Sequence, residues 1–380
     1  MSRVVVIGGG ASGVFFSIYF KKMNPNSEVI ILEQNDRVLK KLLKTGNGRC
    51  NIMNHQIGSI YYNDFSLIDR LYQNYNMELK LQEIGVLVRG DFEGRLYPYT
   101  ESTKAVVNTF LYNLDKYKVD VRTNYRVDKV EQPKFRDRTG KIKKADKFII
   151  NDEIECDYVV FATGSIAQAK TNGYDLLKKL GHKITELKPG LVPLYTKERT
   201  DHLKGLRWKC TIIHKERIRF GEVQFKDKGI SGIIIMDISN NIDDGEVIHI
   251  DMLPELCDYE LRYLVKNNGY KVLEDAFPRP LYQEILRRAE YNEENIIDVI
   301  KDFTYTVTGR RGFDEGQICL GGVDLSCVSK TFESKKCKNL YITGEVLNVD
   351  GGTGGYNLYF AWLSAYEVAN QITLKLRSGE

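Results

Sequence analysis

The sequence predicts an α/β protein in which a nucleotide-binding domain is interrupted by a β-rich domain. Three observations support this fold class. A strand, a glycine-rich turn and a helix follow one another over residues 3–23. A second glycine-rich turn, at residues 351–355, precedes the last helical segment. Between them, from residue 190 onward, short apolar strands separated by turns replace the earlier alternation of strands and helices.

The N-terminal unit is the clearest element. The run from Val4 to Phe20 carries no charge and invites comparison with a signal peptide or a membrane span. Three consecutive glycines break any helix there, no small-residue cleavage site follows, and the run is shorter than a normal span. We therefore expect a strand, a turn and a helix, followed by a second strand over residues 28–33, and no association with a membrane.

The remaining elements of this first domain follow from apolar spacing. They are a helix over 100–117, strands over 119–122, 125–130, 148–150, 153–156, 158–162 and 340–343, and a last helix over 356–374. The polar stretch 132–147 is predicted to be a hairpin tip. We place this domain at residues 1–189 and 305–380.

The insertion, residues 190–304, is predicted to be β-rich with a few helices, and to carry the substrate or cap the site. Its expected strands are 191–195, 210–214, 218–220, 233–238 and 247–250, and its expected helical stretches are 258–267 and 281–301. A domain of this size is ordinary.

Composition excludes several classes of protein. The net charge of +4, from 55 basic and 51 acidic residues, is too small an excess to favour nucleic acid as a partner. The seven cysteines form no CxxC pair and the five histidines show no ligand spacing, so we expect no metal site. Dispersed, reduced thiols are typical of a cytoplasmic protein.

The first glycine turn matches GxGxxG in a context that gives the match weight. Gly8 permits a tight turn, Gly10 lets a pyrophosphate approach the backbone, and Gly13 lets the helix pack closely on the strand. The helix N-terminus offers N–H donors to phosphates. Glu33 ends the next strand, where an acid accepts hydrogen bonds from ribose hydroxyls and repels a 2′-phosphate. The alternative is a structural turn without a ligand.

The C-terminal motif indicates which dinucleotide binds, FAD or NAD. Gly344 and Glu345 end a strand, where a Gly-acid pair can hold a ribityl chain, and residues 349–357 open a helix with four glycines among them. Such a helix start directs N–H groups at the N1–C2=O edge of a flavin, which becomes anionic on reduction. Non-covalent FAD is long enough to extend from the first turn to the last helix, so we favour FAD over NAD.

The chain resembles a bacterial flavoprotein family known as BaiN-like or YhiN-like, often described as aminoacetone-oxidase-type FAD enzymes. The resemblance lies in four stretches: GGGASG, TGNGRCNIMN, GEVQFKDKGISG and TFESKKCKNLYITGEVLNVDGGTGGYNL. It implies a two-dinucleotide-binding-type, Rossmann-like FAD domain split by the insertion. The family usually has Asp at the position of Asn348 and Gln-Trp-Ala at residues 359–361, departures that affect the flavin surroundings or the substrate wall.

The motifs and the resemblance together give a set of cofactor-binding residues. From the glycine turns and their neighbours come Gly8, Gly10, Ala11, Gly13, Gln34, Gly48, Gly344 and Gly354. The resemblance implies contacts from Ser12, Glu33, Arg49, Val127 (through its backbone, to adenine), Thr163, Gly164, Glu345, Gly355, Tyr356 and Asn357.

Catalytic candidates are fewer, because the cofactor carries the chemistry. Cys50, Asn51 and Tyr356 are the catalytic candidates that the glycine-rich motifs place nearest to the flavin. For Cys50 the alternative is a buried thiol that packs under the flavin. The loop 44–54 is therefore predicted to be a flavin clamp. Arg310 and Arg311 are expected either to bind an anionic substrate or the phosphates of NAD(P)H, or to face only solvent. His182, after an apparent helix end, is expected to be structural.

The function predicted from these features is an FAD-dependent oxidoreductase that moves a hydride between flavin N5 and a small organic substrate. No second GxGxxG is present, so NAD(P)H is expected to act as a transient donor, reducing an unsaturated or carbonyl compound. The alternatives are an oxygen-using amine oxidase and a flavin-dependent RNA-modifying protein that contacts RNA with the tip from Lys134 to Lys147. The oligomeric state is not predicted.

Overall fold

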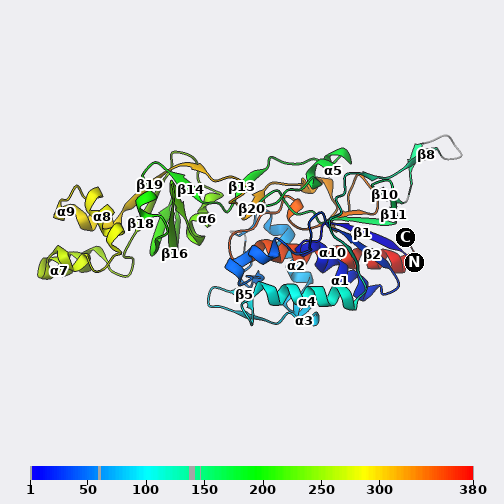
Figure 1. The fold of residues 1–380 in the computed structure, drawn as a ribbon, viewed down its shortest axis with the longest axis horizontal. Helices are drawn as coiled ribbons and strands as arrows, with labels where there is room; N and C mark the ends of the chain where they lie inside the picture. Colours follow the sequence, from blue (N-terminus) through cyan, green and yellow to red (C-terminus); the bar gives the residue numbers. More distant parts are fainter. Residues whose placement is uncertain (1, 59–60, 137–141, 146, 380) are drawn as a thin grey trace. The chain divides into compact units, whose positions relative to one another are not determined.

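The computed structural model describes residues 2–58, 61–136, 142–145 and 147–379. The chain divides into two compact units (Figure 1). Unit 1 comprises Met1–Lys188 and Ile318–Glu380, and unit 2 comprises Pro189–Gln317. Each unit has its own cluster of buried apolar side chains. The predicted α/β class with a β-rich insertion is confirmed.

Unit 1 is built on a five-stranded parallel sheet with strand order β21-β12-β1-β2-β6. The strands are β1 (Arg3–Ile7), β2 (Glu28–Leu32), β6 (Asp120–Arg122), β12 (Tyr158–Phe161) and β21 (Leu340–Ile342). β1, β2, β12 and β21 are buried almost throughout, as expected of strands covered on both faces. β1 lies between β2 and β12, so the loops after these strands meet at one edge of the sheet.

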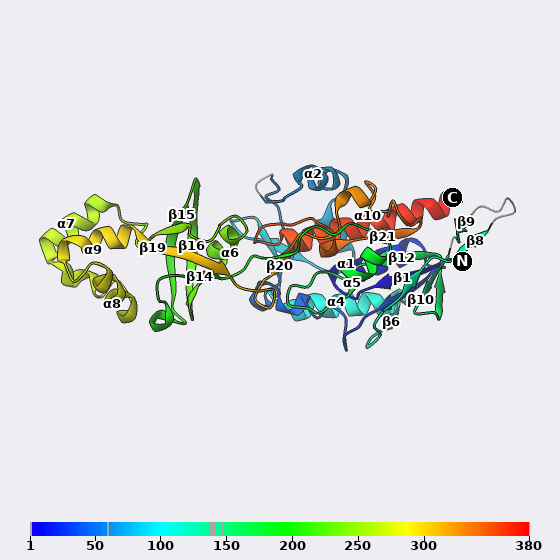
Figure 2. The ribbon, with the colours of Figure 1, turned by 90° about the horizontal axis from the view of Figure 1, so that it is seen from above.

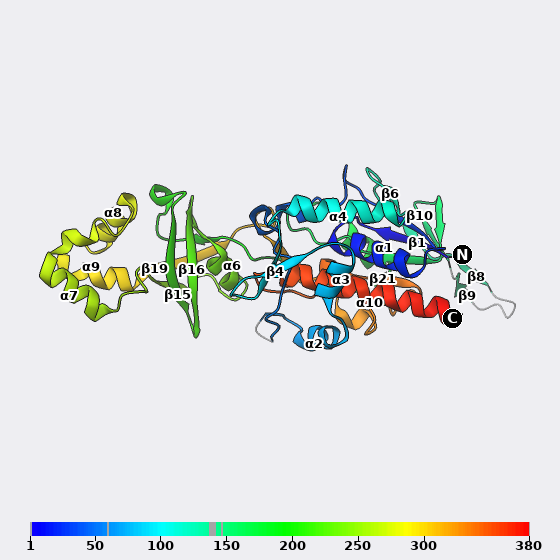
Figure 3. The same ribbon diagram turned by 90° about the horizontal axis from the view of Figure 1, so that it is seen from below.

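Three helices pack around this sheet (Figures 2 and 3). They are α1 (Ala11–Met23), α4 (Thr103–Lys116) and α10 (Tyr356–Ser378), and α1 and α10 lie side by side. α1 is apolar on every side because it is enclosed: Val14, Phe15 and Phe20 are fully buried. Phe15 stands 5.2 Å from Trp362 of α10, measured between ring centroids.

Smaller elements complete unit 1. The helices are α2 (Phe65–Asn74), α3 (Met77–Glu83) and α5 (Gly173–Lys179), with the 3₁₀ segments η1 (Leu42–Gly48), η4 (Leu325–Cys327) and η5 (Gly344–Val346). β3 (Met53–Asn54), β5 (Arg95–Pro98) and β4 (Val88–Gly90) form one antiparallel sheet, and β7 (Val130–Glu131), β10 (Phe148–Ile150) and β11 (Ile154–Cys156) form another. β8 (Lys134–Arg136) pairs with β9 (Ile142–Lys144), and β13 (Lys188–Gly190) and β20 (Ile318–Leu320) flank the insertion in sequence. The pairing of 148–150 with the next strand is confirmed, whereas the strand expected over 125–130 is reduced to β7.

Unit 2 is a closed barrel with strand order β14-β17-β16-β15-β18-β19. Its elements are β14 (Leu194–Thr196), β15 (Arg207–His214), β16 (Arg217–Lys226), β17 (Gly229–Ser231), β18 (Val247–Asp251), β19 (Phe303–Arg310), α6 (Ile233–Ser239), α7 (Asp258–Asn268), α8 (Arg279–Arg288), α9 (Glu293–Lys301), η2 (Asp201–Leu203) and η3 (Tyr270–Leu273). Figure 2 shows α7, α8 and α9 on one side of this barrel and α6 on the opposite side.

Two expectations about unit 2 require correction. The strand expected over 233–238 is helix α6: although its isoleucines favour a strand, Ile234, Ile235 and Ile238 are buried on one helical face. The boundary expected at 304/305 differs from the structural division after residue 317, because β19 pairs with β18 and β14 and completes the barrel. None of the described helices is long and apolar enough to cross a membrane.

Candidate functional site

The edge at the carboxyl ends of β1, β2, β12 and β21 brings together most of the residues predicted to bind the cofactor. Gly8 follows β1, and its N–H donates to the carbonyl of Leu32 in β2 at 2.9 Å. Thr163 and Gly164 follow β12, and Gly344 follows β21. A Cβ added at Gly344 would lie 2.5 Å from the Ser12 hydroxyl, so the last strand touches the start of α1.

The three glycines at the GxGxxG positions of the first turn have different surroundings. Gly8 has a φ of +107°, and a Cβ there would collide with the carbonyl oxygen of Ala162. At Gly13 a Cβ would collide with the carbonyl of Gly8 itself. Gly10, in contrast, has no protein atom within 4 Å of the position that a Cβ would take. Two glycines thus serve packing, and the third leaves open space beside the N-terminus of α1.

Glu33 is only 7% exposed and is oriented by the backbone around it. One carboxylate oxygen accepts from the N–H of Gly9 at 2.8 Å, and the other accepts from the N–H of Asn35 at 2.8 Å. The Asn35 side chain donates to the same second oxygen at 2.6 Å. A carboxylate has about four acceptor positions, so one remains for a ribose hydroxyl.

The loop 44–54 lies against the second glycine turn. A Cβ at Gly355, whose φ is +97°, would stand 2.6 Å from Asn51 Oδ1 and 2.8 Å from the backbone of Met53. Asn54 Nδ2 donates to the carbonyl of Gly354 at 3.1 Å. Asn357 closes the turn from the helix side, with Nδ2 donating to the carbonyl of Gly351 at 2.8 Å. The loop and the start of α10 therefore form one substructure.

Two buried polar atoms in this region have no hydrogen-bond partner among the described residues: Asn51 Oδ1 and Thr163 Oγ1. An unpaired buried polar atom is costly, so each is expected to be satisfied by a bound group. Asn51 Oδ1 lies against Gly355 of the second glycine turn, and the Cα of Thr163 lies against Gly8 of the first, while the Thr163 Oγ1 lies against Gly173 at the start of α5. Beside Gly164, as beside Gly10, the backbone faces open space. These features fit a long polar dinucleotide extended between the two turns.

Three of the predicted residues make contacts within the protein. Arg49 is exposed, pairs with Glu101 at 2.7 Å from Nε, and stacks on the Tyr97 ring at 4.8 Å. The Gln34 side chain donates to the carbonyl of Lys170. Val127 is buried, and its carbonyl accepts from Asn172 Nδ2 at 2.8 Å.

Tyr356, a catalytic candidate, is embedded among other tyrosines. Its ring stacks on that of Tyr61 with centroids 4.4 Å apart, and its carbonyl accepts from the Tyr62 hydroxyl at 2.9 Å. Only 2% of Tyr356 is exposed. This packing fixes the direction in which α10 begins.

Cys50 is fully buried, with a φ of +59°. Burial raises the pKa of its thiol to about 11, so the thiol is neutral at pH 7 and a poor nucleophile. These features favour the interpretation as a packing residue.

Thiol chemistry tests that interpretation. Of the seven free cysteines only Cys257 is exposed, so the native protein should react rapidly with one equivalent of Ellman's reagent. Cys257→Ser should abolish the rapid phase, and Cys50→Ala should leave it unchanged. Rapid modification of Cys50 in the native protein, traced by peptide mass, would contradict a packing role.

The sequence interpretation overlooked a polar cluster next to Glu345. Lys41 Nζ pairs with Glu345 Oε2 at 2.7 Å, and the N–H of Cys319 donates to Glu345 Oε1 at 3.3 Å. The carboxyl of Asp350 and the hydroxyl of Tyr174 act electrostatically on the same group of side chains. Asp350 lies within the C-terminal glycine motif. No pattern of residue spacing in the sequence, however, relates it to Lys41 or Tyr174.

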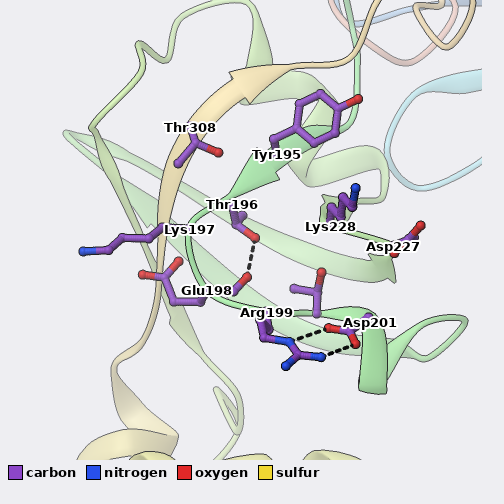
Figure 4. Close-up of a pocket in the computed structure, with 10 residues that line it drawn as sticks. Tyr195, Thr196, Lys197, Glu198, Arg199, Asp201, Asp227, Lys228 and Thr308 are labelled. Atoms are coloured by element: carbon purple, nitrogen blue, oxygen red, sulfur yellow. Dashed lines mark hydrogen bonds and ion pairs between the residues drawn. The ribbon is translucent and has the colours of Figure 1, made fainter.

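Unit 2 holds a separate cavity of about 510 Å³ at one end of the barrel (Figure 4). No predicted site residue is among those lining it. Arg199 is paired with Asp201 at 2.8 Å, and Glu198 accepts from the N–H of Thr306 at 2.8 Å. Arg199 and Asp201 therefore neutralise each other in the cavity wall.

The open question about the Arg310-Arg311 pair is answered by contacts within unit 2. Arg310 donates to the carbonyl of Ile242 at 2.5 Å, and Arg311 pairs with Glu315 at 3.0 Å while stacking on the Tyr195 ring at 4.5 Å. His182 is structural, as expected: it is buried, and one ring nitrogen lies 2.7 Å from the Ser334 hydroxyl. Among the described residues, no group of three or more His, Cys, Asp or Glu side chains could hold a metal ion.

Comparison with known proteins agrees with this geometry. A 3-dehydro-bile acid delta(4,6)-reductase from Clostridium scindens is 28% identical over 96% of this chain and 98% of its own length. A ribosomal RNA dihydrouridine synthase from Haemophilus influenzae is 26% identical over 98% of each chain. The solved structure of a 3-ketosteroid-delta4-(5alpha)-dehydrogenase from Rhodococcus jostii superimposes on this chain with a TM-score of 0.51 at 13% sequence identity. The superposition covers 98% of this chain and 97% of that one, which shows that the two proteins share a fold.

The family model described as the HI0933-like protein Rossmann domain matches residues 2–371. That range includes both glycine turns, the loop 44–54 and the whole insertion. The resemblance that the motifs indicated is thereby confirmed: the chain belongs to the HI0933-like family of Rossmann-domain proteins.

Proposed function

We propose that the protein is an oxidoreductase that binds FAD non-covalently in unit 1. The observation that carries this proposal is a pair of buried atoms without a partner among the described residues: Asn51 Oδ1, against Gly355 of the second glycine turn, and Thr163 Oγ1, in the residue that follows β12 and lies against Gly8. When bound, FAD supplies a centre that accepts and donates hydride. The residues proposed to hold it are Gly8, Gly10, Ala11, Ser12, Gly13, Glu33, Gly48, Thr163, Gly164, Gly344, Glu345, Gly354, Gly355 and Asn357.

Each part of the site has a distinct role in this proposal. Gly10 and Ser12 present the N-terminus of α1 to the pyrophosphate. Glu33, held by Gly9 and Asn35, accepts from the adenosine ribose. The N-terminus of α10 gives N–H groups and a partial positive charge to the flavin edge that becomes anionic on reduction. Arg49, with its partner Glu101, stabilises the loop from outside rather than contacting the cofactor.

The reaction we propose is the addition of hydrogen across a carbon–carbon double bond conjugated to a carbonyl group. The names of the two curated relatives support it. The two double bonds of a 3-keto-delta(4,6) steroid and the C5=C6 bond of uracil are all conjugated to a carbonyl, and reduction of any of them is a conjugate addition of hydride followed by protonation. NAD(P)H is the proposed donor, and it docks at the flavin because the chain has a single GxGxxG.

A stopped-flow experiment tests this reaction. The holoenzyme is mixed anaerobically with NADH or NADPH, and the reduced protein is then mixed with a 4,6-dien-3-one steroid. We expect loss of the flavin absorbance in the first step and its recovery, with saturated product, in the second. A protein that no nicotinamide reduces, and whose chemically reduced form reacts with oxygen but not with the dienone, would instead be an oxidase.

An RNA substrate is the second candidate, favoured by the relatives named as dihydrouridine synthases. The same reduced protein, mixed with protein-free ribosomal RNA, would then recover its flavin absorbance and yield dihydrouridine. In residues 189–317 acidic side chains outnumber basic ones, which disfavours tight binding to phosphates by unit 2. The basic tip from Lys134 to Lys147 lies largely outside the described residues and side chains.

A further inference from the structure

Asp350 occupies an unusual position for an acidic residue. It immediately precedes the second glycine turn, and its Oδ2 accepts from the N–H of Gly321 at 3.2 Å and from Asn63 Nδ2 at 3.2 Å. Its own N–H donates to Asn63 Oδ1 at 2.8 Å. No described cation pairs with it: Lys41 is bound to Glu345 instead, at 2.7 Å. The carboxyl is thus held in place by neutral donors only.

A second, independent feature marks this place as one where a ligand belongs. Tyr174, in α5, is only 4% exposed, and its hydroxyl faces the thiol of Cys319, a weak hydrogen-bonding group, with no nitrogen or oxygen partner among the described residues. Burial raises the pKa of this hydroxyl, and so do the neighbouring Cys319, Glu345 and Asp350, which locates it in the same cluster. A buried hydroxyl whose neighbour is only a weakly bonding thiol, beside a fixed carboxyl, is a place where a substrate or water oxygen is expected.

The protonation state of Asp350 follows from these surroundings. Burial raises its pKa to about 7, the Gly321 N–H opposes this rise, and the charge of Glu345 adds to it. The other titratable groups facing the cluster are Lys41, Tyr174 and Cys319. Burial first, and then Glu345 and Asp350, raise the pKa of the Cys319 thiol to about 12, so that the thiol stays neutral.

We propose that Asp350 is the general acid of the reduction, delivering its carboxyl proton to the α-carbon of the unsaturated carbonyl substrate. This inference rests on the proposed function. The proposed FAD site places Glu345 along the ribityl chain and the turn 351–355 at the flavin edge, and Asp350 lies between them in the chain. With FAD bound as proposed, the carboxyl would lie beside the reacting part of the cofactor and not at its adenine end.

The step balances without any further reagent. A hydride that originates from NAD(P)H adds to the β-carbon, and the α-carbon takes the proton as the O–H bond of Asp350 breaks. The product has gained two hydrogens, NAD(P)⁺ is released, and the carboxylate regains a proton from solvent. A carboxyl with a pKa near 7 suits this role, because it is half protonated at neutral pH and is a stronger acid than water.

The test uses Asp350→Asn in the holoenzyme, since the amide oxygen can still accept from Gly321. Reoxidation of the reduced protein by a 4,6-dien-3-one steroid is followed from about pH 5 to pH 9. In the wild type the rate should fall as the pH rises through about 7, as the protonated acid is lost. In Asp350→Asn the rate should be about 100-fold lower and lack this transition. Reduction by NAD(P)H should change less than about threefold, and Asp350→Glu should restore part of the rate.

A second measurement does not depend on the substrate. The midpoint potential of bound FAD is recorded against pH in the wild type, in Asp350→Asn and in Asp115→Asn, whose carboxyl is on the exposed side of α4. A carboxyl beside the flavin should produce a break near pH 7 that only Asp350→Asn removes.

The outcomes separate the two proposals. If the wild type binds no FAD or reduces no conjugated substrate, the proposed function fails and this inference fails with it. If the wild type reduces the dienone and Asp350→Asn keeps the same rate, pH profile and potential, only the role of Asp350 is overturned.

Discussion

Gly10→Val is expected to abolish retention of FAD while leaving the fold intact. No protein atom lies within 4 Å of a Cβ at Gly10, and its φ of −78° is one that any residue adopts, so the protein itself tolerates the side chain. The branched side chain would fill the space proposed for the pyrophosphate and cover the N-terminus of α1. We expect the Kd for FAD to rise at least about 100-fold, which corresponds to about 2.8 kcal/mol.

The matched control is Gly90→Val in the same unit, because Gly90 likewise has no neighbour within 4 Å and no left-handed backbone. Flavin absorbance after desalting and the thermal midpoint are measured for both variants. We expect both to unfold near the wild-type temperature and only Gly10→Val to be colourless. A Gly10→Val protein that keeps a full complement of FAD would show that the cofactor does not bind along this turn.

Trp362→Ala is expected to lower the free energy of unfolding by about 3–5 kcal/mol and to weaken FAD binding. Trp362 is fully buried in α10, with its ring 5.2 Å from that of Phe15 and 5.6 Å from that of Phe110. Its Nε1 donates to the carbonyl of Ile52 at 2.9 Å and so anchors the loop 44–54. Removing the indole creates a cavity and leaves a buried carbonyl without its donor.

Trp208→Ala provides the comparison, because Trp208 makes the equivalent bond in unit 2, from Nε1 to the carbonyl of Met252 at 2.7 Å. Denaturant unfolding and FAD titration are carried out on both variants. Trp362→Ala should lose affinity for FAD, and Trp208→Ala should keep it. Equal affinities in the two variants would contradict a role for the loop 44–54 in holding the cofactor.

The sequence was sufficient to predict the parts of the site that lie in continuous motifs. The first glycine turn, Glu33 and the second glycine turn each follow or precede an element recognisable from apolar spacing, and parallel strands bring the loops after them to one edge. The fold class followed for the same reason. Local pattern and tertiary structure agree in these elements.

Other features depend on contacts that no local pattern contains. The isoleucines of 233–238 favour a strand by propensity, but the barrel offers them one buried face and they form α6. The resemblance assigned Arg49 to the cofactor, and the ion pair of Arg49 with Glu101, far along the chain, could not be predicted from the motif. Asp350, Tyr174 and Lys41 come from three separate segments, so only the folded chain shows that they meet.

The central claim is that unit 1 holds one FAD between the two glycine turns. The most direct test is the absorbance spectrum of the purified protein after desalting, together with the amount of FAD released on denaturation. The account predicts a yellow protein with about one FAD per chain. A colourless protein that does not take up added FAD, and binds NAD in its place, would contradict it.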